Sequence, residues 1–311
     1  MAANKNSPMG FLKHGLPRPL GLLIALFCLV ALAAVVTRLA FVLLRPVPPR
    51  TVTMAMYPEG SLNAELVKRY REVLARNGID LKLAPSAGAV ESVARLPDPT
   101  SAISIAIVPG GITTERDSPE LVSLGTLFYQ PLWVFSRGRP LQSGGQLRGL
   151  RISIGPEGSS SHAICLQLLT RVGMIDQKSA ILFYLTPSES AQKLIHGEID
   201  VAVFLDAWES PAVQQLLNTK DVNLESITRA DAFVSLYPYL NKLVLPAGVV
   251  DMAKPQPPTD VLLVAPKASL VVRKNLAPRT LPYREEIRRL LITCFSPIGL
   301  RRRSVQRMLF R

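Results

Sequence analysis

A short pattern that occurs twice constrains the fold of this chain most. The tetrapeptide PEGS follows an apolar stretch at 51–56 and again follows one at 151–155. The two stretches alternate as strands do, PEGS is typical of a turn, and the apolar spacing in 62–76 and 161–171 predicts helices. A strand, a loop and a helix are therefore expected twice, in the same order.

The parallel between the two halves continues beyond these helices. The further predicted elements are a strand at 79–83, a turn at Pro85-Ser86, a helix at 90–96 and a strand at 103–108, and then a strand at 181–185, a turn at Pro187-Ser188, a helix at 190–196 and a strand at 201–205. Two βαβαβ units of this kind predict two α/β lobes, each with a parallel sheet and right-handed crossovers.

The PEGS loops are the first candidate ligand contacts. Ligands of open α/β sheets bind beyond the carboxyl ends of the strands, so facing lobes would bring both loops to one cleft. Gly60 and Gly158 permit turns that a Cβ would hinder. Hydroxyls and free amide N–H groups at helix starts attract an anion. The serines in these positions are Ser61, Ser159, Ser160 and Ser161.

A second pair of serines strengthens this interpretation. Ser86 and Ser188 each follow a proline at the end of the second strand of their half. The alternative is that all these serines are ordinary helix caps with no ligand, as in many α/β folds. The matched positions in the two halves favour ligand contact.

The segment 20–44 is nearly all apolar and is long enough to cross a hydrocarbon core of about 30 Å as a helix. We expect a single transmembrane anchor there, after a cytoplasmic N-terminus at 1–19 and before a stiff Pro-rich linker at 45–50. A cleaved signal peptide ending at Ala31-Leu32-Ala33 is the alternative. The apolar run continues past that point, which favours an uncleaved signal anchor.

The net charge of +13 does not indicate nucleic-acid binding. Residues 1–45 carry five bases and no acid, and 279–311 carry nine arginines and two glutamates, so the body between them is nearly neutral. Cys28 lies in the apolar segment, Cys165 in a predicted helix and Cys294 in the tail, so neither a disulfide framework nor a paired-cysteine zinc site is expected. No metal and no cofactor are expected.

An enzyme is a weak interpretation of this sequence. A serine-dependent hydrolase would need a base, and the only histidines are His14, His162 and His196. His14 precedes the apolar segment, and the other two fall at the beginning and end of predicted helices. No GxSxG elbow, P-loop or HExxH motif occurs. We therefore expect no catalytic residues.

Several segments together resemble one family. They include YPEGSLNAELVKRYREVL, PSAGAVESVARL, LVSLGTLFYQPLWVFSRG, LRGLRISIGPEGSSSHAICLQLL, GEIDVAVFL and VLLVAPKASLVVRKNL. In order and spacing, residues 51–276 are similar to the TAXI solute receptors of TRAP transporters, and more loosely to type II periplasmic binding proteins.

The resemblance implies two α/β lobes joined by crossing strands near 127–135 and 243–250. Lobe I would comprise 51–135 and 245–278, lobe II would be 136–244, and a basic C-terminal tail would follow at 279–311. The tail is interpreted as a divergent terminus, with contact to an anionic membrane surface as the alternative. The ligand-contacting residues expected from the repeat and the resemblance are Tyr57, Gly60, Ser61, Ser86, Gly88, Ala89, Tyr129, Gly158, Ser159, Ser160, Ser161, Ser188 and Asp206.

Some positions depart from the family's pattern. Ala89 stands where relatives have a serine, and the serine cluster replaces their GSGT, so ligand specificity cannot be carried over. Asp206 follows the third strand of the second half; it could pair with a ligand amine, but capping of the next helix is favoured.

The expected function is capture of a small carboxylate-bearing or amino-acid-like solute between the lobes, for delivery to a TRAP transporter membrane subunit. The folded body would lie in the periplasm, tethered to the inner membrane. A membrane-anchored sensory or scaffolding module with a vestigial cleft is the second hypothesis, and a hydrolase the third.

Overall fold

The computed structural model describes residues 18–43, 51–57, 67, 70–72, 74–76, 79–141, 144–173 and 180–274. The chain divides into two compact units, Met1–Pro48 and Pro49–Arg311, and each is considered by itself. The predicted linker at 45–50, the first PEGS loop and the tail at 279–311 lie outside the described residues.

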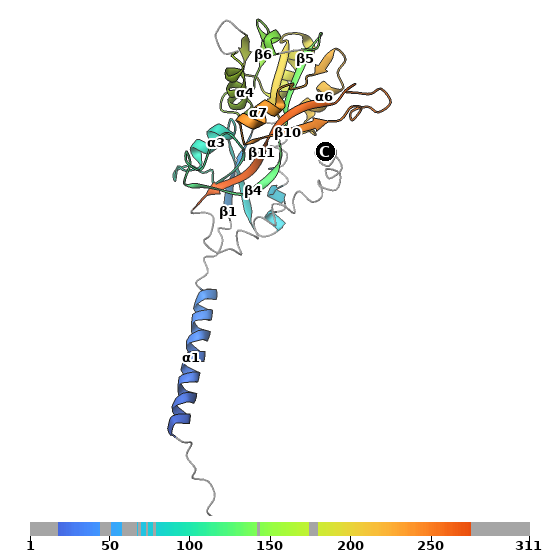
Figure 1. Ribbon diagram of the computed structural model, residues 1–311. Helices are drawn as coiled ribbons and strands as arrows, with labels where there is room; N and C mark the ends of the chain where they lie inside the picture. Colours follow the sequence, from blue (N-terminus) through green and yellow to red (C-terminus); the bar gives the residue numbers. More distant parts are fainter. Residues whose placement is uncertain are drawn as a thin grey trace, which may run out of the picture. The chain divides into compact units, whose positions relative to one another are not determined.

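The described residues of the first unit form one helix, α1, which spans Arg18–Leu43 (Figure 1). Large apolar side chains along it, among them Phe27, Val30 and Leu39, are exposed. Across the residues that the structure describes, no helix has the combination of length and apolarity needed to cross a membrane.

The second unit is built on two sheets. The first sheet has the order β10-β11-β3-β1-β2, with β4 also paired to β11. Its strands are β1 (Thr51–Met56), β2 (Asp80–Pro85), β3 (Ile105–Pro109), β4 (Leu121–Tyr129), β10 (Leu240–Leu245) and β11 (Val261–Arg273). The second sheet has the order β7-β6-β8-β5-β9. Its strands are β5 (Leu132–Arg137), β6 (Arg151–Ser153), β7 (Ile181–Phe183), β8 (Val201–Leu205) and β9 (Val222–Leu224).

The two sheets share a topology that matches the sequence repeat. In the first, β1 lies between β2 and β3 and is parallel to both; in the second, β6 lies in the same way between β7 and β8. In each sheet an antiparallel strand lies beside the third parallel strand: β11 beside β3, and β5 beside β8. The predicted duplication of strand order is confirmed. We call the part built on β1 to β4 and the second half of β11 lobe I. The part built on the second sheet, together with β10 and the first half of β11, is lobe II.

Helices cover the sheets. Those with described bounds in the second unit are α3 (Ala89–Arg95), α4 (Ser160–Arg171), α5 (Pro187–His196), α6 (Pro211–Leu217) and α7 (Ala230–Leu236), with a short 3-10 helix η1 at Gly144–Leu147. Helix α5 has complete end signals: Thr186 and Glu189 form a capping box, and Gly197 ends the helix with φ +74°. Within the helix expected at 62–76, Val67, Tyr70 and Leu74 are helical and buried.

Strand β11 contributes to both lobes (Figure 1, orange). Its first half, up to Pro266, pairs with β10, whereas Lys267–Arg273 pairs with β4, and Ala268 to Val272 also with β3. Leu263 and Ala265 pack into the core of lobe II with Trp133, while Leu270 packs into the core of lobe I. Burying a leucine side chain contributes about 1.5–3 kcal/mol, so both cores depend on this strand.

The chain passes between the lobes at two places. The first is Gln130 and Pro131, between β4 and β5, inside the range expected at 127–135. The second lies within β11, near Pro266, rather than at the expected 243–250. Residues 243–245 belong to β10, whose apolar side chains pack in lobe II. The family resemblance implied a connecting strand at 243–250, but the longer β11 makes the connection.

Candidate functional site

The carboxyl ends of the parallel strands bring the two lobes into direct contact. The loop after β2 leads to α3, and the loop after β6 leads to α4. The amide of Val90, in α3, donates a hydrogen bond of 3.1 Å to the carbonyl oxygen of Gly158. A Cβ built on Gly88 would lie 2.6 Å from the Gly158 oxygen and 2.6 Å from the Cα of Ser159. We call this contact between residues 86–90 and 158–161 the junction.

Protein groups fill the lobe I side of the junction. The Ala87 amide donates to the Glu91 carboxylate at 2.6 Å, and the Gly88 amide donates to the Ser86 hydroxyl at 3.4 Å. Ser86 is buried and also exchanges a hydrogen bond of 2.8 Å with Ser92. The Ala87 amide, and then Arg95, lower the pKa of Glu91. Its carboxylate therefore stays charged and takes the place that an anion would take at this helix start.

On the lobe II side, two of the three serines bond to their own lobe. The Ser159 hydroxyl accepts from the His162 amide at 3.1 Å, so it caps α4. Ser161 is buried, and its hydroxyl accepts from the Leu205 amide at 2.9 Å. Ser160 opens α4 and is half-buried. Positive φ at Gly158 (+77°) bends the loop toward lobe I, a conformation that favours glycine.

Other expected site residues lie in the core or at the surface. Tyr57 is buried and donates a hydrogen bond of 2.6 Å to the carbonyl of Ile107, and burial raises the pKa of its phenol. Ala89 is also buried. Ser188 is exposed in the first turn of α5, which begins at Pro187 instead of after a turn there. Gly60 and Ser61 lie outside the described residues.

Polar groups also gather at the first crossing between the lobes. The Asp206 amide donates to the Pro131 carbonyl at 3.3 Å, and the indole N–H of Trp133 donates to the Asp206 carbonyl at 2.9 Å. The buried carboxylate of Asp206 accepts from the Ala207 amide at 2.8 Å. The expected capping role is not met, because α6 begins five residues later with Ser210 as its N-cap residue. Tyr129, at the end of β4, places its half-buried ring 5.5 Å from the Lys267 ammonium.

Sequence reasoning missed two residues near this crossing. Gln130 is 2% exposed and Ser210 is 0% exposed. Among the described residues, the side-chain oxygen of each is buried without a hydrogen-bond partner. Buried polar atoms usually have a partner, so two such atoms beside the crossing are consistent with a polar group binding there. The only signal in the sequence is that Gln130 interrupts an apolar run.

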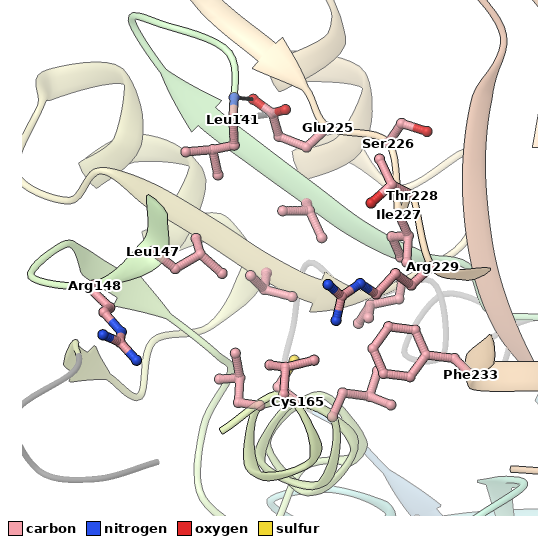
Figure 2. A pocket seen from close by; sticks show the side chains of 16 residues that line it. Leu141, Leu147, Arg148, Cys165, Glu225, Ser226, Ile227, Thr228, Arg229 and Phe233 are labelled. Atoms are coloured by element: carbon pink, nitrogen blue, oxygen red, sulfur yellow. Dashed lines mark hydrogen bonds between the residues drawn. The ribbon is translucent and has the colours of Figure 1, made fainter. Parts of the chain in front are cut away.

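The described residues leave a cavity of about 450 Å³, which is not at the junction but inside lobe II (Figure 2). It lies between the sheet face formed by β5 and β8, helix α4, and the segment 225–233. Glu225 is buried at its edge and accepts hydrogen bonds from the Ser136 hydroxyl and, at 3.0 Å, from the Leu141 amide. Burial raises the pKa of Glu225. This pocket was not predicted.

The described residues contain no cluster of three or more histidine, cysteine, aspartate or glutamate side chains that could hold a metal ion. His162 lies beside the Tyr184 ring, with 5.2 Å between the ring centroids, and His196 ends α5. Buried Cys165 lies on α4, and desolvation raises the pKa of its thiol, which disfavours the thiolate needed for nucleophilic attack.

A family model described as NMT1-like matches residues 53–281. The chain belongs to the NMT1-like family. The match covers both sheets and therefore most of the second unit. A comparison with curated proteins found no match. The finer similarity to TAXI receptors is not resolved by these comparisons and stays a prediction.

Solved structures show the same fold at low sequence identity. The periplasmic aliphatic sulphonate binding protein SsuA of Escherichia coli is 15% identical over 84% of this chain and 77% of its own, with a TM-score of 0.50. A protein of Bordetella bronchiseptica RB50 is 13% identical over 80% and 72%, with a TM-score of 0.54. A Xanthomonas citri protein bound to ATP is 13% identical over 80% and 87%, with a TM-score of 0.50. The expected two-lobed, periplasmic-binding-protein-like α/β fold is confirmed.

Proposed function

We propose that this NMT1-like protein is an extracytoplasmic solute-binding protein that captures a small anionic solute where its two lobes meet. The observation that carries the proposal is the junction itself. Loops from the carboxyl ends of two parallel sheets approach each other there, and ligands of such sheets bind at those ends. Family membership and the periplasmic-binding-protein fold support the same class of function.

The proposed mechanism is hinge closure. The backbone contact between Val90 and Gly158 leaves no space for a solute at that point, so the lobes must separate before one enters. A ligand that contacts both lobes then stabilises the closed form, because it adds contacts that the open form lacks. The two passages between lobes, at 130–131 and within β11, are the hinge in this proposal.

The proposed ligand contacts come from both sides of the crossing. The start of the twelve-residue α4, with Ser160 on its first turn, offers amide groups and a helix dipole to an anion. Tyr129, with Lys267 beside its ring, and the buried oxygens of Gln130 and Ser210 supply further polar groups. Of the remaining expected contacts, Gly60, Ser61 and Asp206 stay part of the proposal. A carboxylate or an amino acid is the proposed class of solute.

Delivery and location are also proposals. The apolar run at 20–44, whose described side chains are exposed along α1, is the reason for proposing an uncleaved anchor in the inner membrane. The body would then stand on the periplasmic side, and tethering would raise its concentration near a TRAP-type membrane subunit. Binding without turnover is proposed in place of an enzyme.

A second candidate function is favoured by the filled start of α3. Glu91 and the Gly158 carbonyl satisfy amides that a ligand could otherwise bind, as expected of a vestigial cleft in a sensory or scaffolding module. Opening of the lobes would separate the Gly158 carbonyl from the Val90 amide and leave that amide free to bind a ligand. Glu91 belongs to the same helix as Val90, so its carboxylate would stay bonded to the Ala87 amide.

The experiment is a thermal-shift screen of the full chain against small carboxylates, amino acids and alkanesulfonates. A solute receptor is expected to show a raised Tm with one class, and Gly88→Ala should weaken that shift by preventing full closure. Lys82→Ala, at an exposed position of β2, is the control. If no compound moves the Tm of the wild-type chain, the vestigial cleft becomes the better account.

A further inference from the structure

The pocket in lobe II has the features of a second binding site, separate from the junction. Its lining is mostly apolar and includes Leu132, Val134, Leu168, Leu169, Val203 and Phe233. Its volume of about 450 Å³ lies within the range of about 300–1,000 Å³ typical of small-molecule sites. The pocket is formed by lobe II alone, so lobe closure is not needed to build it.

The pocket opens toward solvent, and exposed residues such as Arg148 and Thr228 are part of its lining. Most of its surface is apolar and offers water no hydrogen-bond partner, so an apolar occupant that displaces this water is favoured. The Glu225 carboxylate, at its edge, is already bonded to Ser136 and Leu141. An apolar occupant therefore fits the lining best.

Two arginines line the pocket from opposite sides. Arg229 and Arg148 are both exposed. Figure 2 shows the guanidinium of Arg229 directed toward the middle of the pocket from the segment 225–233, with Arg148 on the opposite side. No described acidic side chain forms an ion pair with either arginine. An anionic group held at Arg229 would form charge-assisted hydrogen bonds with its guanidinium.

We propose that the lobe II pocket binds a single-chain anionic amphiphile, such as a medium-chain fatty acid, with its chain between α4 and the sheet and its carboxylate at Arg229. The proposal does not rest on the proposed solute-receptor function, because no junction residue lines the pocket.

The test uses the full chain in a detergent-free amphipol and measures binding of decanoate, hexanoate, decanol and decylamine by native mass spectrometry and calorimetry. Decanoate is expected to bind most tightly, because only it combines a long chain with an anion. Arg229→Gln should weaken decanoate binding about tenfold and leave decanol binding unchanged, since the variant removes only the charged bond. Arg171→Gln, on an exposed arginine of α4 outside the pocket, is the matched control.

Filling the pocket provides the second arm. Val134→Phe should abolish the binding of both decanoate and decanol, while circular dichroism verifies that the chain is folded. Gly88→Ala should leave decanoate binding unchanged, which separates this site from the junction.

Three results would overturn the proposal: equal affinity for decanoate and hexanoate, equal effects of Arg229→Gln and Arg171→Gln, or unchanged binding in the folded Val134→Phe variant. Absence of binding by the wild-type chain would also overturn it, including the case in which deletion of residues 279–311 restores binding, because the tail would then be the occupant.

Discussion

The junction and the lobe II pocket differ in almost every physical respect. The junction is polar, lies between the lobes, and has backbone groups in contact, with Val90 bonded to Gly158. The pocket is mostly apolar, belongs to lobe II alone, and contains space. The comparison teaches that strand ends determine where loops meet, whereas side-chain packing determines where room is left. The repeated sequence therefore indicated the first region and gave no sign of the second.

The largest expected effect comes from breaking the junction. Gly88→Ala should reduce the free energy of unfolding by about 1–3 kcal/mol and hold the lobes apart, because the new Cβ would meet backbone atoms at 2.6 Å. Gly88 has an extended backbone with φ 164°, so strain at the substituted residue is not a second cause. Denaturant unfolding and small-angle X-ray scattering measure the two consequences. An unchanged scattering curve would mean that the junction is not a tight contact in solution.

A substitution in lobe II, away from the junction and the pocket, gives a reference for the size of these effects on stability. Arg151 and Asp200 form a two-bond ion pair, with contacts of 2.8 and 3.1 Å, and Arg151 holds the pKa of Asp200 below its usual range. Asp200→Asn should cost about 1 kcal/mol, since the pair is partly exposed and water screens it. The pair's contribution is present above the ordinary pKa of aspartate and is lost as pH falls through the lowered value. Urea titrations at several pH values test this.

A matched variant for that measurement is Glu198→Gln, which removes the more exposed pair with Lys193. It should change stability much less than Asp200→Asn does, because water screens an exposed ion pair. If both variants were equally destabilised, the bidentate geometry of the Arg151 pair would not be the cause of the stability lost in Asp200→Asn.

Filling the pocket should have a smaller effect of opposite sign. Val134→Phe is expected to stabilise the ligand-free chain by about 1 kcal/mol, because the larger side chain occupies existing space. The same substitution at Val122, half-buried against the core of lobe I, should destabilise it instead. The thermal stabilities of the two variants compare the filling of a pocket in lobe II with the overfilling of a packed core in lobe I. A loss of stability in both would indicate that the pocket closes in solution.

The smallest expected effect is a pH dependence at the edge of the pocket. Burial raises the pKa of Glu225, so the folded chain holds this proton at pH values where the unfolded chain has released it. The contribution to stability is present below the ordinary pKa of glutamate and is lost as pH rises through the raised value. Glu225→Gln should flatten this part of the stability curve, measured by denaturant titrations from acidic to neutral pH. If wild type and variant show the same dependence of stability on pH, another titratable group is responsible for it.

Much of the fold follows from local sequence patterns. The strands and helices of the two βαβαβ units were predicted, because the periodicity of a buried strand or helix face is visible in consecutive residues. What failed depends on partners distant in sequence. The second crossing lies in β11 rather than at 243–250, since its place depends on pairing with β3, β4 and β10 at once.

The candidate site was predictable only in part, for a similar reason. Ser86, Ser159 and Ser161 were expected to offer hydroxyls to a ligand, yet each bonds to its own lobe. Sequence identifies a hydroxyl but not its partner. Gln130 and Ser210 were missed because their significance depends on burial, which single positions do not reveal. Strand ends predicted a meeting of the two PEGS loops, and the first of these lies outside the described residues. The contact that the structure describes joins the turn after β2 to the second PEGS loop.

Strand β11 also has a consequence for how the chain matures. It lies between β3 and β10 and also pairs with β4, yet it is formed by residues 261–273, long after most of lobe I has been synthesised. Until it arrives, β3 and β4 present unpaired edges of the kind that promote aggregation. Neither half can therefore finish folding before that late strand has been synthesised.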